Sequence, residues 1–361
     1  MATTFKTLTN NDIASTRTLL HEAIPITGTI VTGTYGASTV ALGSEPNVKN
    51  FAHEMFQSVY DYPYLSSSAN HIFDITVGYA TSSAFNNEND TSYHDKKVNT
   101  YNQMAMVLMG YDSTGSVQTV RLFDRDGDLT GGGKITETVF VNFSRLLVKD
   151  EIKKGSFSMT FGTSSFANER LNVGPLFKIG DTNANNAFKV NSPAGEYGIL
   201  YEQEPDNNTN DPVGLLFYQA GIAVLNVSGS LTGAGAINTT TFDSDGSSAM
   251  LLLTGAFSQE ASANAWRHRI NNIAFNNTVE LNSTVYFCRA NHNEFNYSAN
   301  PSYVTGSKIR VKTNVTDTPI SYITSVGLYS ADNELLAVAK LSEPLKKDPT
   351  NEITLRVRLD Y

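Results

Sequence analysis

Three aspartates alternate in the segment "DRDGDLTGGGKI", at Asp124, Asp126 and Asp128. This alternation matches positions 1, 3 and 5 of an EF-hand calcium loop, in which carboxylates are the main ligands. Such a loop also needs Gly at position 6 and a bidentate Glu at position 12, but these positions hold Leu129 and Ile135. Because the bidentate carboxylate is missing, we interpret the segment as a Gly-rich turn between strands and expect no metal site.

The other reactive residues form no catalytic pattern. No histidine lies in a zinc-binding H-E-x-x-H spacing, and the chain has neither a G-x-S-x-G elbow nor a phosphate-binding G-x-x-x-x-G-K-[ST] loop. The single cysteine, Cys288, alternates with aromatics in "STVYFCRAN", so we expect it to pack in the interior. Asp and Glu are plentiful, which leaves a cell-wall depolymerase with paired carboxylates open. We expect no catalytic residue, no cofactor and no enzyme activity.

The charge of the chain argues against a nucleic-acid partner. The formal net charge is -9 and the pI is about 5.2, whereas nucleic-acid binding usually needs a basic face. The only Trp stands in "AWRHRI", beside Arg267, His268 and Arg269. In so short a segment of an acidic chain, we expect Trp266 to pack in the interior and its charged neighbours to lie on the surface.

No segment predicts secretion or membrane insertion. The N-terminal segment shows no basic-then-apolar signal pattern, and no run approaches the ~20 apolar residues of a membrane span. We therefore expect a soluble chain that is made in the cytoplasm without export and has no membrane partner.

The pattern of apolar residues predicts a mainly β (α+β) protein, with β-sandwich or barrel domains and a few N-terminal helices. Helical spacing favours helices over residues 9–24 and 45–61, and residues 81–97 are typical of a polar loop. The run 101–112 fits a helix or a strand. From about residue 156 onward, short apolar runs separated by Gly, Asn, Asp and Pro are typical of a sandwich or barrel.

Two hairpins stand out in the second half of the chain. "LLFYQAGIAVL" (215–225) predicts one with its turn at Gln219–Gly221. "ITSVGLYSADNELLAVAKL" (323–341) predicts another around Ser-Ala-Asp-Asn-Glu, and "EITLRVRLDY" (352–361) predicts a closing strand with one apolar face.

Composition divides the sequence into four expected regions. Residues 1–80 form a helix and extended-arm region that includes "ITGTIVTGTYGAST", and residues 81–227 form a central, mostly β domain. Residues 228–248 are a Gly/Ser/Thr-rich loop, and residues 249–361 are a C-terminal β module. A loop of this length inside a β domain is usually functional or mobile.

Several motifs resemble those of one family of viral proteins. They are E-F-N-x-x-x-N-P-S at Glu294–Ser302, I-T-x-[IV]-G-L-Y at Ile323–Tyr329, and N-E-L-L-A-V-[AG]-K-L at Asn333–Leu341. Together with blocks at 55–79 and 139–162, they resemble virion structural proteins of tailed bacteriophages, especially T4-like phages of marine cyanobacteria. The C-terminal block also resembles hairpins of tail-fibre and baseplate attachment modules.

The resemblance implies a structural part of the virion, most simply a baseplate or tail-fibre-adaptor protein in the tail, assembled in the host cytoplasm. The implied partners are other phage structural proteins and copies of the same chain in a symmetric homo-oligomer, because extended arms and strand edges join repeated subunits. A neck or capsid-decorating protein and a receptor-binding protein for a host glycan are the alternatives. The expected assembly-interface residues are Tyr322, Leu328, Tyr329, Leu335, Leu336, Arg356, Arg358 and Tyr361.

Overall fold

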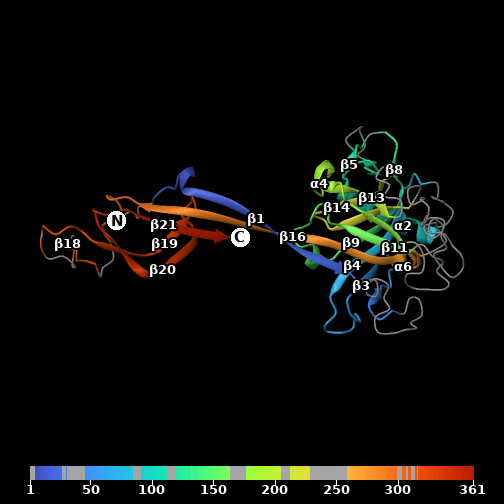
Figure 1. Ribbon diagram of the computed structural model, residues 1–361, viewed down its shortest axis with the longest axis horizontal. Helices are drawn as coiled ribbons and strands as arrows, with labels where there is room; N and C mark the ends of the chain where they lie inside the picture. Colours follow the sequence, from blue (N-terminus) through green and yellow to red (C-terminus); the bar gives the residue numbers. More distant parts are fainter. Residues whose placement is uncertain are drawn as a thin grey trace. The chain divides into compact units, whose positions relative to one another are not determined.

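The structure is a computed structural model, and its described residues form a mainly β protein, as predicted. Most strands join one large antiparallel sheet, and a few helices pack beside it (Figure 1). The described residues are 5–26, 30, 45–83, 91–112, 119–129, 131–162, 176–204, 212–227, 258–298, 303–305, 308–309, 314 and 316–361. The predicted loop 228–248 and nearly all of the predicted arm segment 26–39 lie outside these residues.

The chain divides into two compact units. Unit 1 consists of Met1–Leu19 and Glu280–Tyr361, and unit 2 consists of Leu20–Val279. The division falls within two strands, β1 (Ile13–Ile26) and β16 (Ile270–Ala290). None of the boundaries expected after residues 80, 227 and 248 coincides with it.

Unit 2 contains most of the strands and helices. They are β2 (Val48–Asn50), β3 (Gln57–Tyr60), β4 (His71–Tyr79), α2 (Thr91–Leu108), β5 (Tyr111–Asp112), β6 (Thr119–Val120), β7 (Phe123–Asp124), β8 (Lys134–Ile135), β9 (Glu137–Phe143), α3 (Arg145–Val148), β10 (Glu151–Ile152), β11 (Ser158–Gly162), β12 (Leu176–Gly180), α4 (Ala184–Ala187), β13 (Tyr197–Glu204), β14 (Pro212–Phe217), β15 (Ile222–Asn226) and α6 (Gln259–Arg269). The hairpin predicted at 215–225 is confirmed, since β14 and β15 pair with Phe217 opposite Ile222.

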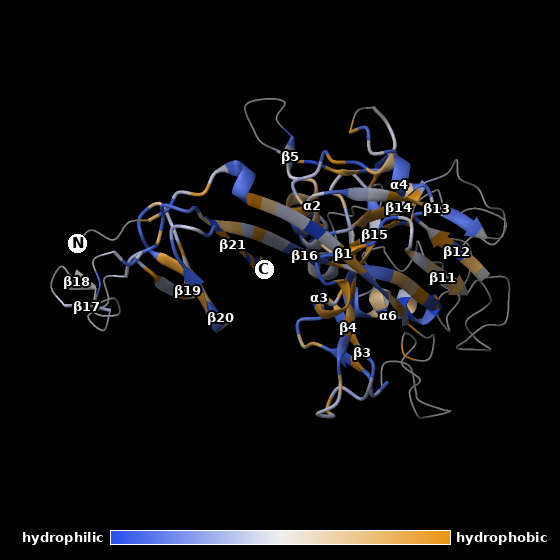
Figure 2. Cartoon of the chain, turned by 60° about the vertical axis from the view of Figure 1, so that its left-hand side comes forward, coloured by the Kyte–Doolittle hydropathy of each residue, from blue (hydrophilic) through white to orange (hydrophobic). Residues whose placement is uncertain are grey.

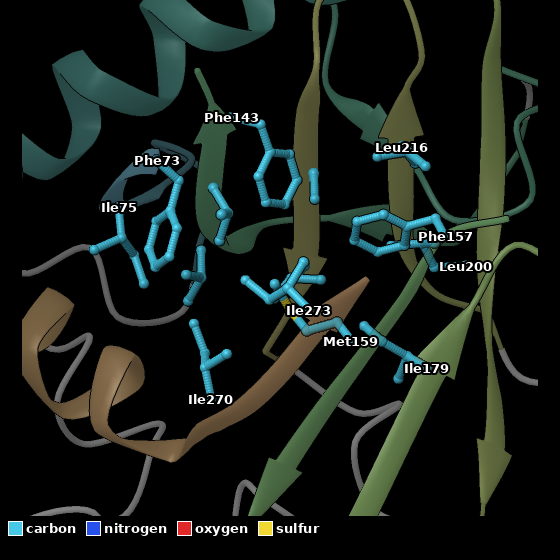
Figure 3. Close-up of a cluster of buried hydrophobic side chains, with 14 of the residues drawn as sticks. Phe73, Ile75, Phe143, Phe157, Met159, Ile179, Leu200, Leu216, Ile270 and Ile273 are labelled. Atoms are coloured by element: carbon cyan, nitrogen blue, oxygen red, sulfur yellow. The ribbon is translucent and has the colours of Figure 1, made fainter. Parts of the chain in front are cut away.

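The large sheet curls around an apolar interior. Its strands follow the order β1-β16-β11-β12-β13-β14-β15-β9-β4-β3-β2. The rings of Phe143 on β9 and Phe275 on β16 have centroids 5.2 Å apart. In a flat sheet these two strands would lie about 29 Å apart, at about 4.8 Å per step. The sheet must therefore bend back on itself, and Figure 3 shows the side chains that fill the interior, including Phe157 and Ile273.

Helix α2 covers a second apolar cluster, which is built on alternate residues of the same strands. Tyr101, Ala105 and Leu108 are buried there with Phe140 of β9. The helix comes very close to β4 at Gly78. A Cβ at Gly78 would lie 2.8 Å from the main-chain oxygen of Lys97 and 2.9 Å from the main-chain nitrogen of Tyr101.

The helix predicted at 9–24 is wrong, because this segment forms β1. β1 pairs along β16, where Ser15 Oγ lies 3.3 Å from Thr284 Oγ1 and Arg17 forms an ion pair with Glu280. The segment "ASTRTLL" is rich in Thr, whose branched side chain favours extended backbone. Pairing with a long distant strand overrides the local helical spacing.

The helix predicted at 45–61 is also wrong, because β2 and β3 form a hairpin there. Val48 pairs with Val59, and Val59 lies opposite Phe73 on β4. Val48 and Val59, two of the apolar residues that recur at helical spacing, form a cross-strand pair instead.

The polar loop predicted at 81–97 is wrong in its second part, because α2 begins at Thr91. His94 and Lys97 are buried on the inner face of this helix, so their polar character concealed the helical pattern. Of the two possibilities for residues 101–112, the helix is correct up to Leu108. Within the described part of the chain, no helix combines the length and the hydrophobicity needed to cross a membrane.

Unit 1 is built mainly from strands, which differ widely in length. It includes β1 up to Leu19 and β16 from Glu280 onward. It also contains a 3-10 helix (Asn10–Asp12), β17 (Val304–Thr305), β18 (Lys308–Ile309), β19 (Ser321–Tyr329), β20 (Leu335–Lys347) and β21 (Ile353–Asp360). The hairpin predicted at 323–341 and the closing strand predicted at 352–361 are both confirmed. β21 pairs with β16 from Ser283↔Asp360 to Ala290↔Ile353.

Candidate assembly interface

The hairpin β19–β20 is fixed by its turn. Asn333 adopts a left-handed conformation with φ of 62°, which Asn tolerates better than most residues. The main-chain nitrogen of Ser330 donates to the oxygen of Glu334 at 2.9 Å, and the nitrogen of Glu334 donates to Ser330 Oγ at 3.1 Å. These bonds set the register, in which Leu328 faces Ala337.

Almost none of this hairpin is buried. Only its two ends, Ser321 and Lys347, are buried, and every residue between them within β19 and β20 is half-buried or exposed. Figure 2 shows hydrophobic colour on both strands of the hairpin. A two-stranded hairpin needs a covering layer to be stable in water, so this hairpin has apolar surface available for a partner.

Three exposed apolar residues of the hairpin, Tyr329, Leu335 and Val338, lie on one face, and Phe5 from the N-terminal segment packs against Tyr329. We call these four residues the hairpin patch. Tyr329 pairs with Leu335, and Gly327 pairs with Val338. A Cβ at Gly327 would lie 2.9 Å from Tyr329 and 3.3 Å from Leu335, so these two side chains lean over the glycine. The Phe5 ring lies 4.7 Å from the Tyr329 ring. These four side chains are 44–53% exposed.

The end of β21 forms a polar cluster with β16. Arg358 Nε donates to Asp360 Oδ1 at 2.7 Å, and Ser283 Oγ donates to the same oxygen at 2.5 Å. The hydrogen bond from Ser283 and then the one from Arg358 lower the pKa of Asp360. The Tyr361 hydroxyl lies 3.0 Å from Thr284 Oγ1. These contacts fix the chain end, while Arg356 and most of Tyr361 remain exposed.

A buried lysine ties the hairpin to the E-F-N motif. Lys347 is fully buried, and its Nζ donates to Asn296 Oδ1 at 2.7 Å, to the main-chain oxygen of Asp348 at 2.9 Å and to that of His292 at 3.3 Å. A buried ammonium is tolerated only where oxygens replace its water. Lys347 therefore holds the end of β20 against the loop that follows β16.

The rest of the motif holds the N-terminal segment and the start of β19. Glu294 forms an ion pair with Lys6 at 2.5 Å, and this bond is the largest cause of the lowered pKa of Glu294. The main-chain oxygen of Phe295 accepts a hydrogen bond from Ser321 Oγ. The second half of the motif, Asn300 to Ser302, lies outside the described residues.

The turn between β20 and β21 is closed by Asp348. Its Oδ1 accepts hydrogen bonds from the hydroxyl of Thr350 at 2.5 Å and from the amide of Thr350 at 2.9 Å. Its other oxygen lies 3.2 Å from Lys346 Nζ. The Thr350 hydroxyl, the Thr350 amide and the Lys346 charge together lower the pKa of Asp348 to about 2.

The predicted interface residues fall into separate groups. Tyr329 and Leu335 belong to the hairpin patch, whereas Leu328 is half-buried on the opposite face. Tyr322 pairs with Lys346 near the other end of the hairpin. Leu336, at the bulge of the hairpin, is 67% exposed. The predicted residues of β21, which are Arg356, Arg358 and Tyr361, belong to a different sheet from the hairpin. Their role in an interface stays a prediction.

The expectation for "AWRHRI" is correct for Trp266 and wrong for its neighbours. Trp266 is fully buried against Phe161, with ring centroids 6.2 Å apart. Arg267 and His268 are also buried, and both contact Glu45 Oε1, at 3.1 Å and 2.9 Å. Burial by itself raises the pKa of Glu45, but the hydrogen bond from His268 and the charge of Arg267 outweigh it and hold the pKa at about 2. Because 222 residues separate Glu45 from Arg267, no local signal reveals this pair.

The three aspartates of "DRDGD" lie close together. Ligand oxygens of Asp124, Asp126 and Asp128 all lie within 4.8 Å of one another. Asp124 is buried and forms an ion pair with Lys134 across β7 and β8. The amide of Asp126 donates to Asp124 Oδ1 at 3.2 Å, and the amide of Asp128 donates to Asp126 Oδ1 at 3.1 Å. These bonds are typical of a carboxylate-stabilised turn.

Comparison with known proteins gives no assignment: the chain matches no protein-family model, no curated protein and no solved structure. Its function has to be inferred from its own residues.

Proposed function

We propose that this chain is a structural component of a tailed-phage virion, a baseplate or tail-fibre-adaptor protein that joins neighbouring subunits. Unit 2 is the rigid body of the protein, and unit 1 is its assembly module. The partners are other structural proteins of the phage and copies of the same chain. The motif resemblance at Glu294–Ser302, Ile323–Tyr329 and Asn333–Leu341 supports the viral class.

The observation that most supports an assembly role is the distribution of buried apolar residues. Among the described residues, 48 hydrophobic residues are buried, and 45 of them belong to unit 2. Unit 1 contributes only Val285, Ala290 and Val357. A domain of about 100 residues normally buries well over half of its chain surface. The described part of unit 1 therefore lacks a core of its own, as is expected of a module whose core is shared with neighbours.

Open strand edges support the same role. Considering the described strands only, β21 pairs with β16 alone, and β19 and β20 pair only with each other. Unpaired edges expose backbone donors and acceptors that another strand can use. In an assembly such edges become joints between subunits.

Incorporation into virions tests this function. Tagged full-length chain is supplied during infection, and purified virions are analysed for it by quantitative mass spectrometry. We expect the wild-type chain in fixed stoichiometry to the tail proteins. Leu335→Glu, which places a charge in the hairpin patch, should reduce incorporation strongly. Leu65→Glu is the matched control, because Leu65 is 86% exposed in unit 2. Absence of the wild-type chain from virions would contradict the proposal.

A second function, binding of a host glycan, is favoured by the loop between β3 and β4. Tyr60 lies 6.3 Å from Tyr64 and 5.5 Å from His71, measured between ring centroids. Tyr62 and Tyr64 are 43% and 36% exposed. The loop is held closed because Asp61 accepts from the amide of Asn70 at 2.6 Å. Rigid exposed tyrosines offer contact area at low entropic cost.

Cell adsorption separates this second function from the first. Under glycan binding, Tyr62→Ala combined with Tyr64→Ala should abolish binding of the purified chain to host cells and leave its incorporation into virions unchanged. Equal adsorption of wild-type and variant chains would exclude the loop as the receptor site.

A further inference from the structure

Among the described residues of the hairpin patch's unit, no third strand pairs with β19 and β20, and neither face of the hairpin is fully buried. The opposite face, with Val326, Leu328 and Ala339, is only half-buried. The hairpin patch itself is about half exposed in every member. Since an uncovered two-stranded hairpin is marginal in water, we expect β19 and β20 to be stably folded only when a partner covers them.

The charge distribution indicates which occupant fits. Unit 1 contains 11 Lys and Arg residues and 10 Asp and Glu residues, whereas unit 2 contains 15 and 25. Unit 1 is therefore nearly neutral, with a net charge of +1, and unit 2 carries a net charge of -10. Copies of unit 1 can approach one another without net repulsion, while copies of unit 2 repel. A basic partner protein would be attracted to unit 2 rather than to the hairpin.

The hairpin patch also has the residue types of an interface centre. Aromatic and aliphatic side chains are enriched at the desolvated core of interfaces, and charged residues are depleted there. Phe5, Tyr329, Leu335 and Val338 include no charge. The nearest charged residue on this face of β20 is Lys340, which pairs with Ser325 and belongs at the rim.

We infer that the hairpin patch is buried against unit 1 of further copies of this chain, and that unit 1 completes its apolar core only in that homo-oligomer. This inference rests on the proposed assembly function and names the partner of its module. Repeated subunits that are joined through the same contact form closed symmetric assemblies when the rotation between neighbours closes. The interface couples folding to assembly, because the side chains that form it also provide the core that unit 1 lacks.

The oligomeric state of the purified full-length chain tests the inference. Sedimentation velocity is measured over a hundredfold range of concentration for wild type, Leu335→Glu and Leu65→Glu. We expect the wild type to form a defined oligomer. Leu335→Glu should weaken self-association at least about 30-fold, the effect of losing one interface hot spot. Leu65→Glu should behave as the wild type does.

Hydrogen exchange of the wild type provides a readout that needs no variant. Dilution below the dissociation constant should remove the protection of β19 and β20 amides and leave unit 2 unchanged. A monomer with protected β19 and β20 would overturn the inference, because unit 1 would then be complete by itself. A monomer with unprotected β19 and β20 would also overturn it, because the cover would then be a different protein. An oligomer that persists in Leu335→Glu would also overturn the inference, because the hairpin patch would then not form the interface.

A failure of this inference can be distinguished from a failure of the proposed function. The solution experiment contains no other phage protein, and virion incorporation is scored separately. A monomeric chain that enters virions would exclude the inference alone, and an oligomeric chain that is absent from virions would exclude the function alone.

Discussion

Gly78 provides a sharp test of how unit 2 is packed. In Gly78→Ala the new Cβ would lie 2.8 Å from one main-chain atom of α2 and 2.9 Å from another. Main-chain atoms cannot rotate away, so the helix must move from β4 by several tenths of an ångström. Overpacking of this kind costs about 1–3 kcal/mol, and Ala normally gains about 0.5–1 kcal/mol over Gly inside a strand. We take the upper half of the first range and expect a net loss of about 2 kcal/mol.

The assay is thermal unfolding of the full chain, followed by the near-ultraviolet signal of the buried aromatics. A loss of about 2 kcal/mol should lower the Tm of unit 2 by about 4–8 °C. Gly132→Ala is the control, because a Cβ there meets nothing within 4 Å, and its Tm should change little. If both variants have the same Tm, α2 does not approach β4 as closely as described, and the predicted overpacking at Gly78 is wrong.

Three further predictions concern unit 1. Lys347→Met should destabilise the hairpin by roughly 2–4 kcal/mol, because the three oxygens that Lys347 Nζ contacts lose their donor. Amide exchange in β19 and β20 measures this loss, and exposed Lys340→Met is the control. Equal exchange in both variants would contradict the prediction. Asn333→Ala should cost about 1 kcal/mol, because φ is 62° there, whereas Asn333→Gly should be neutral; equal melting of the two variants would exclude the left-handed turn. The pKa of Asp348 is about 2 against an ordinary 3.8. Its contribution to the stability of unit 1 is therefore complete above pH 3.8 and is lost as the pH falls toward 2. A carboxyl titration of Asp348 by NMR with a midpoint near 3.8 would refute the hydrogen bonds of this turn.

The parts of the fold that sequence predicted are those fixed by local chemistry. The hairpin turn at Ser330–Glu334 depends on a left-handed Asn333, and the turn before β15 depends on Gly221 with φ of 69°. Both signals lie within a few residues of the structure that they determine. The alternation in residues 352–361 predicted β21 for the same reason.

The parts that it missed depend on distant partners. β1 is a strand because β16, more than 250 residues away, pairs with it. Arg267 is buried because Glu45 compensates its charge. Two of the three oxygens that Lys347 contacts belong to His292 and Asn296, 55 and 51 residues away in the loop after β16, and no spacing in the sequence reveals them. Local propensity cannot predict contacts that only the folded chain creates.

Of the expected interface, the exposed residues of the hairpin could be named in advance, because β alternation and a terminal position indicate them. Phe5 could not, since its contact with Tyr329 joins opposite ends of the chain. The small number of buried apolar residues in the described part of unit 1 was also hidden, because its strands are rich in apolar residues.

The most direct test of the account is to locate this chain in purified intact virions by cryo-electron microscopy. We predict that it occupies a symmetric ring in the tail, with β19 and β20 of unit 1 buried against unit 1 of neighbouring copies. A virion whose tail lacks the chain, or in which the hairpin faces solvent in every copy, would contradict the account.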